Sequence, residues 1–300
     1  MLKVLLIIVA VLVVLFLLFA YILPNIIMLG KRYTYDESLA WQNERYDTTF
    51  YDKLKKTNYT VKGFEDYELH VQFLENPEPT TKYMIISHGY TDNRIGTLKY
   101  AKMYLDFGFN CIIYDLRGHG ENAKTITTYG IREAQDLKCI IDDTRTRYQD
   151  VKVLGLHGES LGAATTITSL KYKPEVDFAV ADCGFSDIEN VLLNLYKNQH
   201  VPGGLYGLAD KMCKLRYHVS LSDARPIDSL DDNTVPVLFI HGADDTFIPP
   251  KNSEDMAART KGYSEIHMIQ KAEHALSIIT DPEQYRVYVK GFLDKIRRNY

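Results

Sequence analysis

The sequence contains few closely spaced residues of the kinds that bind metal ions. Only 4 of its 300 residues are cysteines, and none of them forms a CxxC pair or a cysteine–histidine cluster at zinc-site spacing. The sequence therefore predicts no metal site. We interpret the cysteines as small buried apolar side chains, although their positions leave open whether any of them pair. They are Cys111, Cys139, Cys183 and Cys213.

Strong charge of either sign is also missing. The chain has 35 Lys and Arg residues against 39 Asp and Glu residues, and no basic run is longer than a pair such as Lys55–Lys56. A domain that binds nucleic acid usually presents a clustered basic surface. We therefore do not expect nucleic acid as a partner. Internal repeats and low-complexity tracts are absent as well, which favours an ordinary folded domain.

One long hydrophobic run differs from this ordinary composition. Residues 4 to 23 carry no charge, and 17 of them are Leu, Ile, Val or Phe. Each such side chain favours the bilayer centre by roughly 0.3 to 0.6 kcal/mol, so insertion gains about 5 to 10 kcal/mol. A helix of about 20 residues also reaches across a hydrocarbon layer of roughly 30 Å. We expect residues 1–29 to form a single-pass transmembrane anchor.

A cleaved secretory signal is the alternative for this segment, because Lys3 precedes it and Leu18–Ala20 loosely resembles a cleavage site. The apolar run is longer than the roughly 7 to 15 residues of a signal core and continues through Pro24 into Met28, which favours an uncleaved anchor. The positive charges on its two flanks nearly balance. We expect the protein in the cell membrane, with the following domain on the extracytoplasmic side.

Residues 30–58 form a polar and aromatic juxtamembrane segment. We expect a helix from Asp36 to Arg45 within it, and the sequence assigns the segment no function.

After residue 58 the sequence alternates between short apolar runs and longer segments with helical spacing. Two alternating runs, Tyr59–Lys62 and Tyr67–Phe73, predict a pair of antiparallel strands. The later runs are almost continuously apolar, which is typical of buried parallel strands. They are Tyr83–Ser87, Cys111–Tyr114, Val151–Leu156, Phe178–Ala181, Val235–Ile240 and Glu265–Ile269. Helical spacing occurs at Thr97–Phe107, Ile131–Tyr148, Leu161–Tyr172, Lys251–Lys261 and Pro282–Arg298. This alternation predicts an α/β domain with a mostly parallel, doubly wound sheet.

One connection is longer than the others. Roughly 50 residues separate the strand that ends near Asp182 from the strand that begins at Val235. Helical patterns at Ile188–Lys197 and Leu205–Leu215 predict a small helical lid at about 187–222. We therefore expect one domain over residues 59–300 with a short insertion, rather than two domains.

A serine in a G-x-S-x-G pattern follows the predicted strand Val151–Leu156. Gly158, Ser160 and Gly162 stand where this strand would turn sharply into a helix. Such a turn exposes the serine hydroxyl on strained backbone, and the glycines leave room where a Cβ would collide with neighbouring chain. The N-terminus of the following helix adds free N–H groups and positive potential. Ser160 is therefore the candidate nucleophile.

A serine hydroxyl needs a base to take its proton and a carboxylate to orient that base. His274 follows the last predicted strand, and Asp245 follows the strand Val235–Ile240. Three strand ends would thus bring Ser160, Asp245 and His274 to one crevice, where ligands bind in open α/β sheets. Asp244 is the alternative acid, and the register of the motif favours Asp245.

An acyl-transfer reaction also needs N–H donors for its developing oxyanion. Leu161, the residue after the nucleophile, supplies one N–H group. Tyr90, just after the strand Tyr83–Ser87, is the candidate for the second.

Together these motifs resemble the α/β-hydrolase family, in particular its bacterial membrane-anchored, esterase-like and prolyl-oligopeptidase-like members. The resemblance covers about residue 59 to the C-terminus and rests on HGY at His88, DLRGHG at Asp115, GESLG at Gly158, HGADDTFIP at His241 and the late His274. It implies an α/β-hydrolase fold, the acid at Asp245 and oxyanion donation by the residue after the HG pair. Members generally need no metal or organic cofactor, and their substrates are varied.

Other polar residues near these motifs have a structural interpretation. We expect Arg117 and four histidines to brace loops or pack in the core; the histidines are His88, His119, His157 and His241. Asp115–Gly120 suggests an aspartate nucleophile, but in enzymes of that kind the elbow itself carries the aspartate. Here the elbow carries serine.

The sequence predicts a serine hydrolase that cleaves an ester or related acyl bond of a small molecule through an acyl-enzyme. A serine peptidase or amidase with the same residues is the second hypothesis, because the lid and pocket choose the leaving group. A membrane-tethered binding protein is the third, and the complete set of Ser, His and Asp argues against it. We expect four lid residues to shape the acyl pocket: Val191, Leu192, Leu195 and Leu208.

Overall fold

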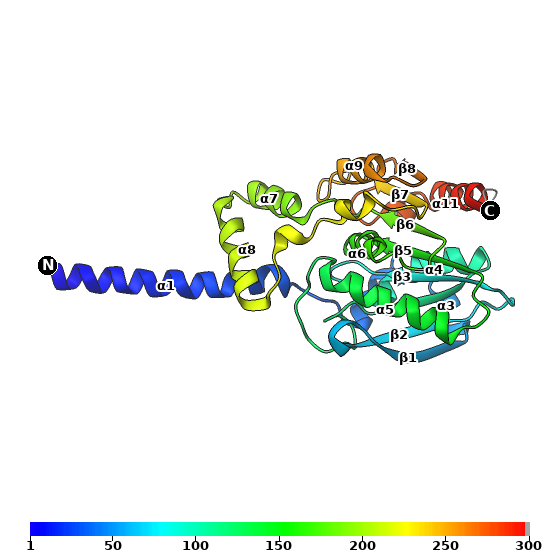
Figure 1. Cartoon of the computed structure of the whole chain (residues 1–300), viewed down its shortest axis with the longest axis horizontal. Helices are drawn as coiled ribbons and strands as arrows, with labels where there is room; N and C mark the ends of the chain where they lie inside the picture. Colours follow the sequence, from blue (N-terminus) through cyan, green and yellow to red (C-terminus); the bar gives the residue numbers. More distant parts are fainter. Residues whose placement is uncertain (298–300) are drawn as a thin grey trace.

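An 8-stranded sheet forms the centre of the computed structural model, which describes residues 1–297 (Figure 1). The strands are β1 Lys56–Lys62, β2 Glu68–Leu74, β3 Lys82–Ser87, β4 Asn110–Tyr114, β5 Val153–Glu159, β6 Phe178–Asp182, β7 Val237–Gly242 and β8 Ser264–Ile269. They lie in the order β1-β2-β4-β3-β5-β6-β7-β8. β2 pairs antiparallel with β1 and β4, and every other neighbouring pair is parallel. β4 lies beside β3 on one side and β5 lies beside β3 on the other, so the order in which the chain adds strands to the sheet reverses between β3 and β5.

The burial of the strands follows their place in the sheet. All residues of β4, β6 and β7 are buried, as expected for strands with helices on both faces. β8 is different, because only Ile269 in it is buried. The prediction of a fully buried strand at Glu265–Ile269 is therefore wrong. β8 is an edge strand, so it has a neighbouring strand on one side only.

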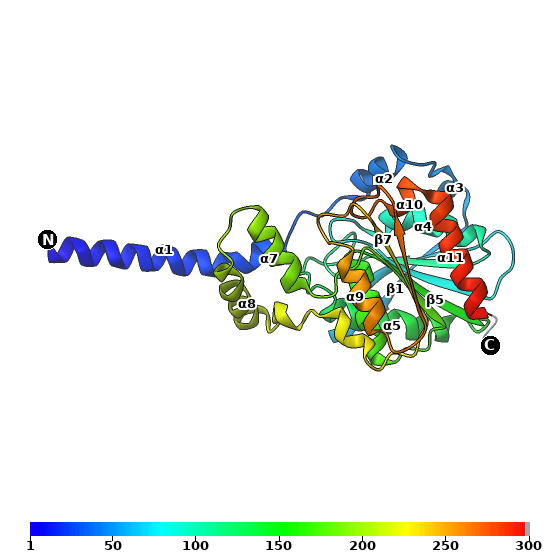
Figure 2. The same ribbon diagram turned by 90° about the horizontal axis from the view of Figure 1, so that it is seen from above.

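Helices cover both faces of the sheet, which confirms the predicted doubly wound arrangement (Figure 2). α5 and α6 contribute to the core on one face, and α4 and α11 to the core on the other. The helices of the body are α2 Tyr35–Asn43, α3 Thr49–Lys53, α4 Leu98–Asp106, α5 Ile131–Arg147, α6 Leu161–Ser169, α9 Lys251–Arg259, α10 Ser277–Thr280 and α11 Pro282–Arg297. Arg298, the predicted end of the last helix, lies outside the described residues.

The segment after the first helix belongs to the body. α2 begins with a capping box, in which the Thr34 hydroxyl accepts from the Glu37 N–H (3.2 Å) and the Glu37 carboxylate accepts from the Thr34 N–H (2.8 Å). The Ser38 hydroxyl then donates to Asp92 (2.5 Å), which joins α2 to the loop after β3. The predicted helix at Asp36–Arg45 is thus present, two residues shorter at its end.

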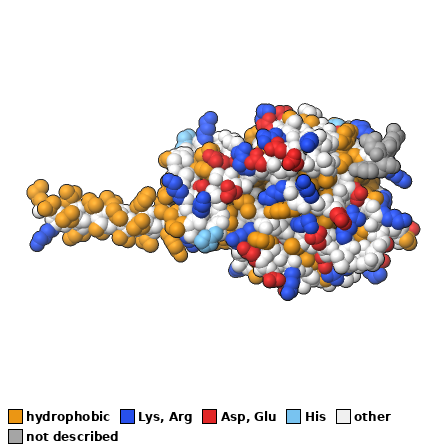
Figure 3. All heavy atoms as spheres, in the orientation of Figure 1, with side chains coloured by type: hydrophobic (Ala, Val, Ile, Leu, Met, Phe, Trp, Pro, Cys, Tyr) orange, Lys and Arg blue, Asp and Glu red, His pale blue; other side chains and the backbone are white. Residues whose placement is uncertain are grey.

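A long helix, α1 (Leu2–Met28), projects from the body (Figures 1 and 3). It is long and apolar enough to cross a membrane, and its side chains up to Ile22 are exposed except Ala20. The last turns differ from the rest, because Leu23, Ile27 and Met28 are buried against the body.

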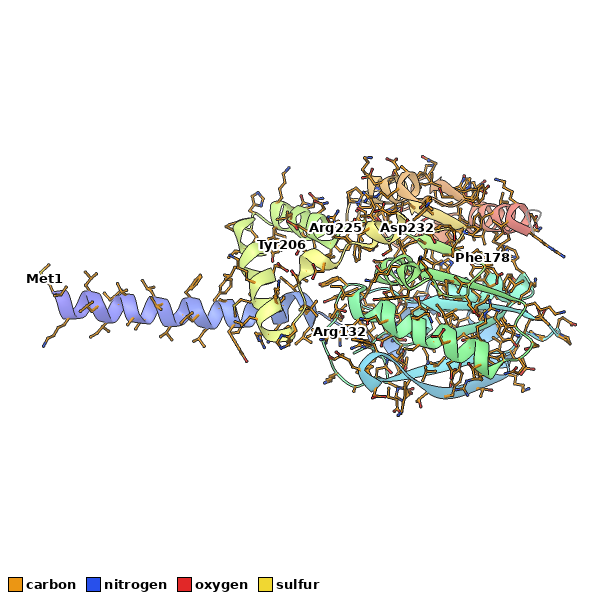
Figure 4. All side chains as sticks on the ribbon, in the orientation of Figure 1. Met1, Arg132, Phe178, Tyr206, Arg225 and Asp232 are labelled. Carbon is orange, nitrogen blue, oxygen red and sulfur yellow. The ribbon has the colours of Figure 1, made fainter. Side chains whose placement is uncertain are left out.

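The predicted lid folds as two helices between β6 and β7, α7 (Ile188–Asn198) and α8 (Gly204–Tyr217). α8 lies beside α1, and the Tyr217 hydroxyl donates to the Asn25 side chain (2.5 Å). Arg132 of α5 donates to the Tyr217 carbonyl (3.3 Å), which joins the lid to the body (Figure 4).

Candidate active site

Ser160 lies on the sharp turn between β5 and α6. Its φ of 52° and ψ of -113° fall outside the conformations that L-residues usually adopt. Strain of this kind costs about 1 to 3 kcal/mol and persists only where surrounding contacts impose it. Here the Ser160 N–H donates to the Asp182 carbonyl (2.9 Å), and its own carbonyl accepts from the Ala164 N–H (3.0 Å). Both contacts fix the turn that presents the hydroxyl.

The two glycines of the motif are required by close backbone contacts. A Cβ on Gly158 would lie 2.1 Å from the Gly162 carbonyl oxygen, and a Cβ on Gly162 would lie 2.2 Å from the Ser87 carbonyl oxygen. No side chain fits at these distances without moving the backbone. The collision that the sequence motif predicts is therefore present at both positions.

The structure brings the three predicted side chains together in one line of hydrogen bonds. His274 Nε2 lies 2.9 Å from Ser160 Oγ, and His274 Nδ1 lies 2.7 Å from Asp245 Oδ2. A carboxylate only accepts, so Nδ1 carries the proton and Nε2 is left to accept from the serine hydroxyl. This is the tautomer that a general base needs.

Asp245 is buried and surrounded by donors. Its Oδ1 accepts from the N–H groups of Phe247 (2.9 Å) and Ile248 (2.8 Å). Burial by itself raises the pKa of this carboxyl, but hydrogen bonds from His241 and His274 outweigh burial and lower the pKa to about 2. Asp244, the alternative acid, is exposed to solvent. The geometry therefore favours Asp245 over Asp244 as the partner of His274.

His241 supports this carboxylate from behind. Its Nε2 faces two acceptors, the Ile248 carbonyl (2.8 Å) and Asp245 Oδ2 (3.2 Å), so this nitrogen carries the proton. Its Nδ1 then accepts from the Ser253 hydroxyl (2.7 Å). The structural interpretation of His241 agrees with these contacts, and they place it directly against the carboxylate.

The two predicted oxyanion donors lie where the chain changes direction across the sheet. Leu161 begins α6 after β5, and Tyr90 follows β3, the neighbour of β5. Such a switch point is where open α/β sheets bind ligands. Within residues 1–297, no acceptor pairs with the N–H of Tyr90 or of Leu161. Both amides are thus free to donate to a substrate oxygen.

A cavity of about 550 Å³ opens over Ser160 and His274. Its lining comes from the loop after β3, from α7 and, unexpectedly, from the N-terminal segment. That segment contributes Ile26, Ile27, Gly30, Tyr33 and Trp41. Three of the four predicted lid residues line the cavity: Val191, Leu192 and Leu195. Among the cavity-lining residues of the described chain, Leu208 is absent, and it packs against the core instead. Its prediction as a pocket residue is wrong, because it lies on α8 rather than α7.

A buried polar cluster lies beside the nucleophile, and sequence reasoning missed it. Lys99 of α4 pairs with Glu159, the residue before Ser160, and donates to the Ala275 carbonyl (3.1 Å), next to His274. The Tyr100 hydroxyl contacts both Glu159 (2.6 Å) and Asp182 (2.9 Å). Burial and the nearby Glu159 raise the pKa of Asp182 to about 6. The sequence signal that could have revealed this cluster is Glu159, the charged residue inside the G-x-S-x-G pattern.

The remaining predictions concern structural residues. Arg117 makes two contacts of 2.7 Å with Asp136, and the buried His157 ring lies 2.9 Å from the Tyr104 hydroxyl. Burial lowers the pKa of His88 to about 4 and that of His119 to about 3, so both rings are neutral at pH 7.

All four cysteines are free. Over residues 1–297, no cluster of three or more His, Cys, Asp or Glu side chains is suited to a metal ion.

Several known proteins are similar to this chain in sequence. The sequence pattern of the prolyl oligopeptidase family matches residues 96–294. The uncharacterized protein YqkD of Bacillus subtilis is 29% identical over 281 residues, which cover 92% of each chain. Human ABHD12B is 28% identical over 187 residues, which cover 59% of this chain and 48% of that protein.

Solved structures give the same fold. The esterase Pf2001 of Pyrococcus furiosus superposes with a TM-score of 0.68 at 22% identity, over 83% of this chain and 94% of that chain. An esterase of Exiguobacterium antarcticum superposes with a TM-score of 0.58 at 16% identity, over 79% of this chain and all of that chain. Because the family pattern covers more than half of the sequence, this protein belongs to the prolyl oligopeptidase family and is an α/β-hydrolase.

Proposed function

We propose that this protein is a membrane-anchored serine hydrolase that cleaves the ester bond of an acyl substrate. The observation that carries the proposal is the line of hydrogen bonds from Asp245 through His274 to Ser160, at a strained turn beside a cavity. A serine, a base and an orienting acid in this order are the machinery of acyl transfer.

The reaction proceeds in two steps. Ser160 Oγ attacks the ester carbonyl carbon while His274 takes the hydroxyl proton, and the N–H groups of Leu161 and Tyr90 hold the oxyanion. The ester C–O bond then breaks, His274 returns the proton to the leaving alcohol, and an acyl-enzyme remains. Water attacks this intermediate with His274 again as base, and the acid is released from a regenerated serine. No cofactor takes part.

An ester suits the cavity better than a peptide. The walls from α1 and α7 are apolar, and the charged side chains of Lys99 and Glu159 satisfy each other. A peptidase or amidase remains the second candidate, because the sequence pattern that this chain matches is named after an oligopeptidase. An ester and an amide that carry the same acyl group separate the two candidates.

A fluorophosphonate probe tests the activated serine in the full-length protein. We expect covalent labelling of the wild type, none of Ser160→Ala, and faster hydrolysis of a nitrophenyl ester than of the matching nitroanilide. Faster hydrolysis of the anilide would replace the esterase with the amidase. A folded wild-type protein that fails to react with the probe would instead favour the membrane-tethered binding protein.

The membrane location is part of the same proposal, with the catalytic domain outside the cell. The motivating feature is the apolar, exposed length of α1. The full-length protein should remain with membranes through a carbonate wash, whereas a cleaved signal would release it. Protease added to intact cells should digest the domain. A domain that survives until lysis would place the active site in the cytoplasm.

A further inference from the structure

The end of helix α1 forms part of the active-site wall. Ile26 and Ile27 line the cavity together with Val191, Leu192 and Leu195 of α7. We infer that the substrate is a single-chain acyl ester dissolved in the membrane, whose chain lies along the wall made by α1 and α7. The inference rests on the proposed function and names its substrate class.

Hydrogen bonds fix the end of α1 to the active site. The Ile27 carbonyl accepts from the hydroxyls of Tyr90 (2.8 Å) and Tyr129 (2.5 Å), whose rings stack with centroids 5.7 Å apart. The Gly30 N–H donates to the same Tyr90 hydroxyl (3.0 Å). Tyr90 is also the residue whose backbone N–H we propose as an oxyanion donor. The position of α1 relative to the cavity is therefore set by the residues that build the site.

The length of α1 sets the depth of the cavity in the bilayer. A span of about 20 residues, residues 4 to 23 in this chain, crosses the roughly 30 Å hydrocarbon layer. Ile26 lies three residues beyond this span, or about 5 Å along the helix. The headgroup layer on each side is about 5 to 8 Å thick. The wall of the cavity thus begins within the headgroup layer rather than in water.

Side chains around the end of α1 fit this depth. Tyr21 is 55% exposed, and aromatic residues of this kind are enriched at the membrane–water boundary. Arg216 of α8 lies over the Tyr21 ring at 3.9 Å, so the lid reaches the same level. Leu215 beside it is 70% exposed, next to the exposed Lys214. An apolar and basic surface at this height suits contact with lipid headgroups.

This placement decides the substrate class. An ester with a long acyl chain concentrates in the bilayer, and its carbonyl group lies at the level where the cavity begins. Such a molecule reaches Ser160 without passing through water. A cavity of about 550 Å³ is within the usual range for ligand sites and matches one chain better than two.

A matched pair of variants on one helix face tests the inference. Ile26 is 65% exposed and lines the cavity, whereas Ile22 lies one turn earlier, is 49% exposed and does not line the cavity as described. The full-length wild type and both variants are placed in vesicles of phosphatidylcholine and phosphatidylglycerol. Hydrolysis of 1-palmitoylglycerol in the vesicles is compared with hydrolysis of p-nitrophenyl butyrate in the water.

We expect the wild type to prefer the palmitoyl ester. Ile26→Ser should lower the ratio of palmitoyl to butyryl hydrolysis about tenfold, and Ile22→Ser should leave the ratio unchanged. A wild type that prefers the butyrate, an equal effect of both variants, or faster cleavage of the two-chain vesicle lipids would overturn the inference while esterase activity stands. Hydrolysis of neither ester would defeat the proposed function itself. Fluorophosphonate labelling of each variant shows that its active site is folded.

Discussion

The active-site cavity has two unlike sides. On one side, the buried Lys99 and Glu159 form an ion pair, and Glu159 also contacts the buried Tyr100 hydroxyl, which in turn contacts Asp182. On the other side, α1 and α7 present apolar side chains without directional contacts. Stabilising charge that develops in a reaction requires fixed dipoles in a dry site, whereas binding an acyl chain requires only apolar area. From this comparison we expect bond cleavage and substrate choice to depend on separate parts of the chain.

The largest effect should come from the polar side. Ser160→Ala or His274→Ala should lower kcat for ester hydrolysis by about 10⁴ to 10⁶, and the double variant should be no worse than either single one, because the residues act as a unit. Steady-state kinetics on protein with an unchanged circular dichroism spectrum measures this. More than a tenth of wild-type turnover in folded Ser160→Ala would refute the role of Ser160.

The next test compares Asp245 with its neighbour in sequence, Asp244, as the acid that orients His274. Asp245→Asn should lower kcat by about 10³ to 10⁴, because His274 loses the acceptor that fixes its tautomer. Asp244→Asn, one residue away on an exposed side chain, should have little effect. If the two losses came out in the opposite order, Asp244 would be the acid.

Lys99 joins both halves of the site, so its removal should have an intermediate effect. Lys99→Met removes the charged partner of the buried Glu159 and frees the loop that carries His274. We expect kcat to fall about 10- to 100-fold with little change in KM. Lys102→Met on the same helix is the control, since Lys102 pairs with Asp106 at the surface. A change confined to KM would show that Lys99 binds substrate rather than positioning the site.

Substitutions in α7, on the apolar side of the cavity, should change the preference among acyl esters more than the turnover rate. Val191→Ser or Leu195→Ser should lower the preference for long over short acyl esters by about fivefold, with kcat for the short ester affected less. Leu193→Ser on the same helix and Leu208→Ser on α8 should not alter the preference, because neither side chain lines the cavity as described. An unchanged preference in all four variants would place the acyl chain elsewhere.

The last expected effect concerns stability against pH. The pKa of Asp245 falls from its ordinary value near 3.8 to about 2 on folding, so ionised Asp245 contributes about 2 kcal/mol above pH 4. This contribution is lost as the pH falls through 2. The stability difference between wild type and Asp245→Asn should therefore shrink between pH 4 and pH 2 in urea unfolding. A difference that stays constant over this range would contradict the low pKa.

Local motifs explain why so much of the molecule could be predicted. The strand runs are continuous in sequence, and Ser160, Asp245 and His274 each follow such a run, so the parallel sheet alone brings them to one edge. The pairing of Lys99 with Glu159 joins a helix to a strand distant in sequence and leaves no periodic pattern. The catalytic roles themselves stay predictions until the variants are measured.

The N-terminal helix was harder to interpret for a different reason. Lipid and protein interior both select apolar side chains, so hydropathy cannot distinguish the exposed Ile22 from the buried Leu23 or Ile27. A boundary at residue 29 is the natural choice from composition. The distinction becomes visible only when the neighbours of each side chain are known.

The hydrogen bonds of Tyr90 have a practical consequence for any shortened form of this protein. A chain that begins at Gly30 would lose the Ile27 carbonyl, and with it the acceptor of the Tyr90 and Tyr129 hydroxyls beside the proposed oxyanion donor. It would also expose the surface that Met28 covers. A chain cut before Leu23 would lose mostly side chains that point outward. The useful boundary between the projecting part of α1 and the body therefore lies inside the helix, one and a half turns before its end.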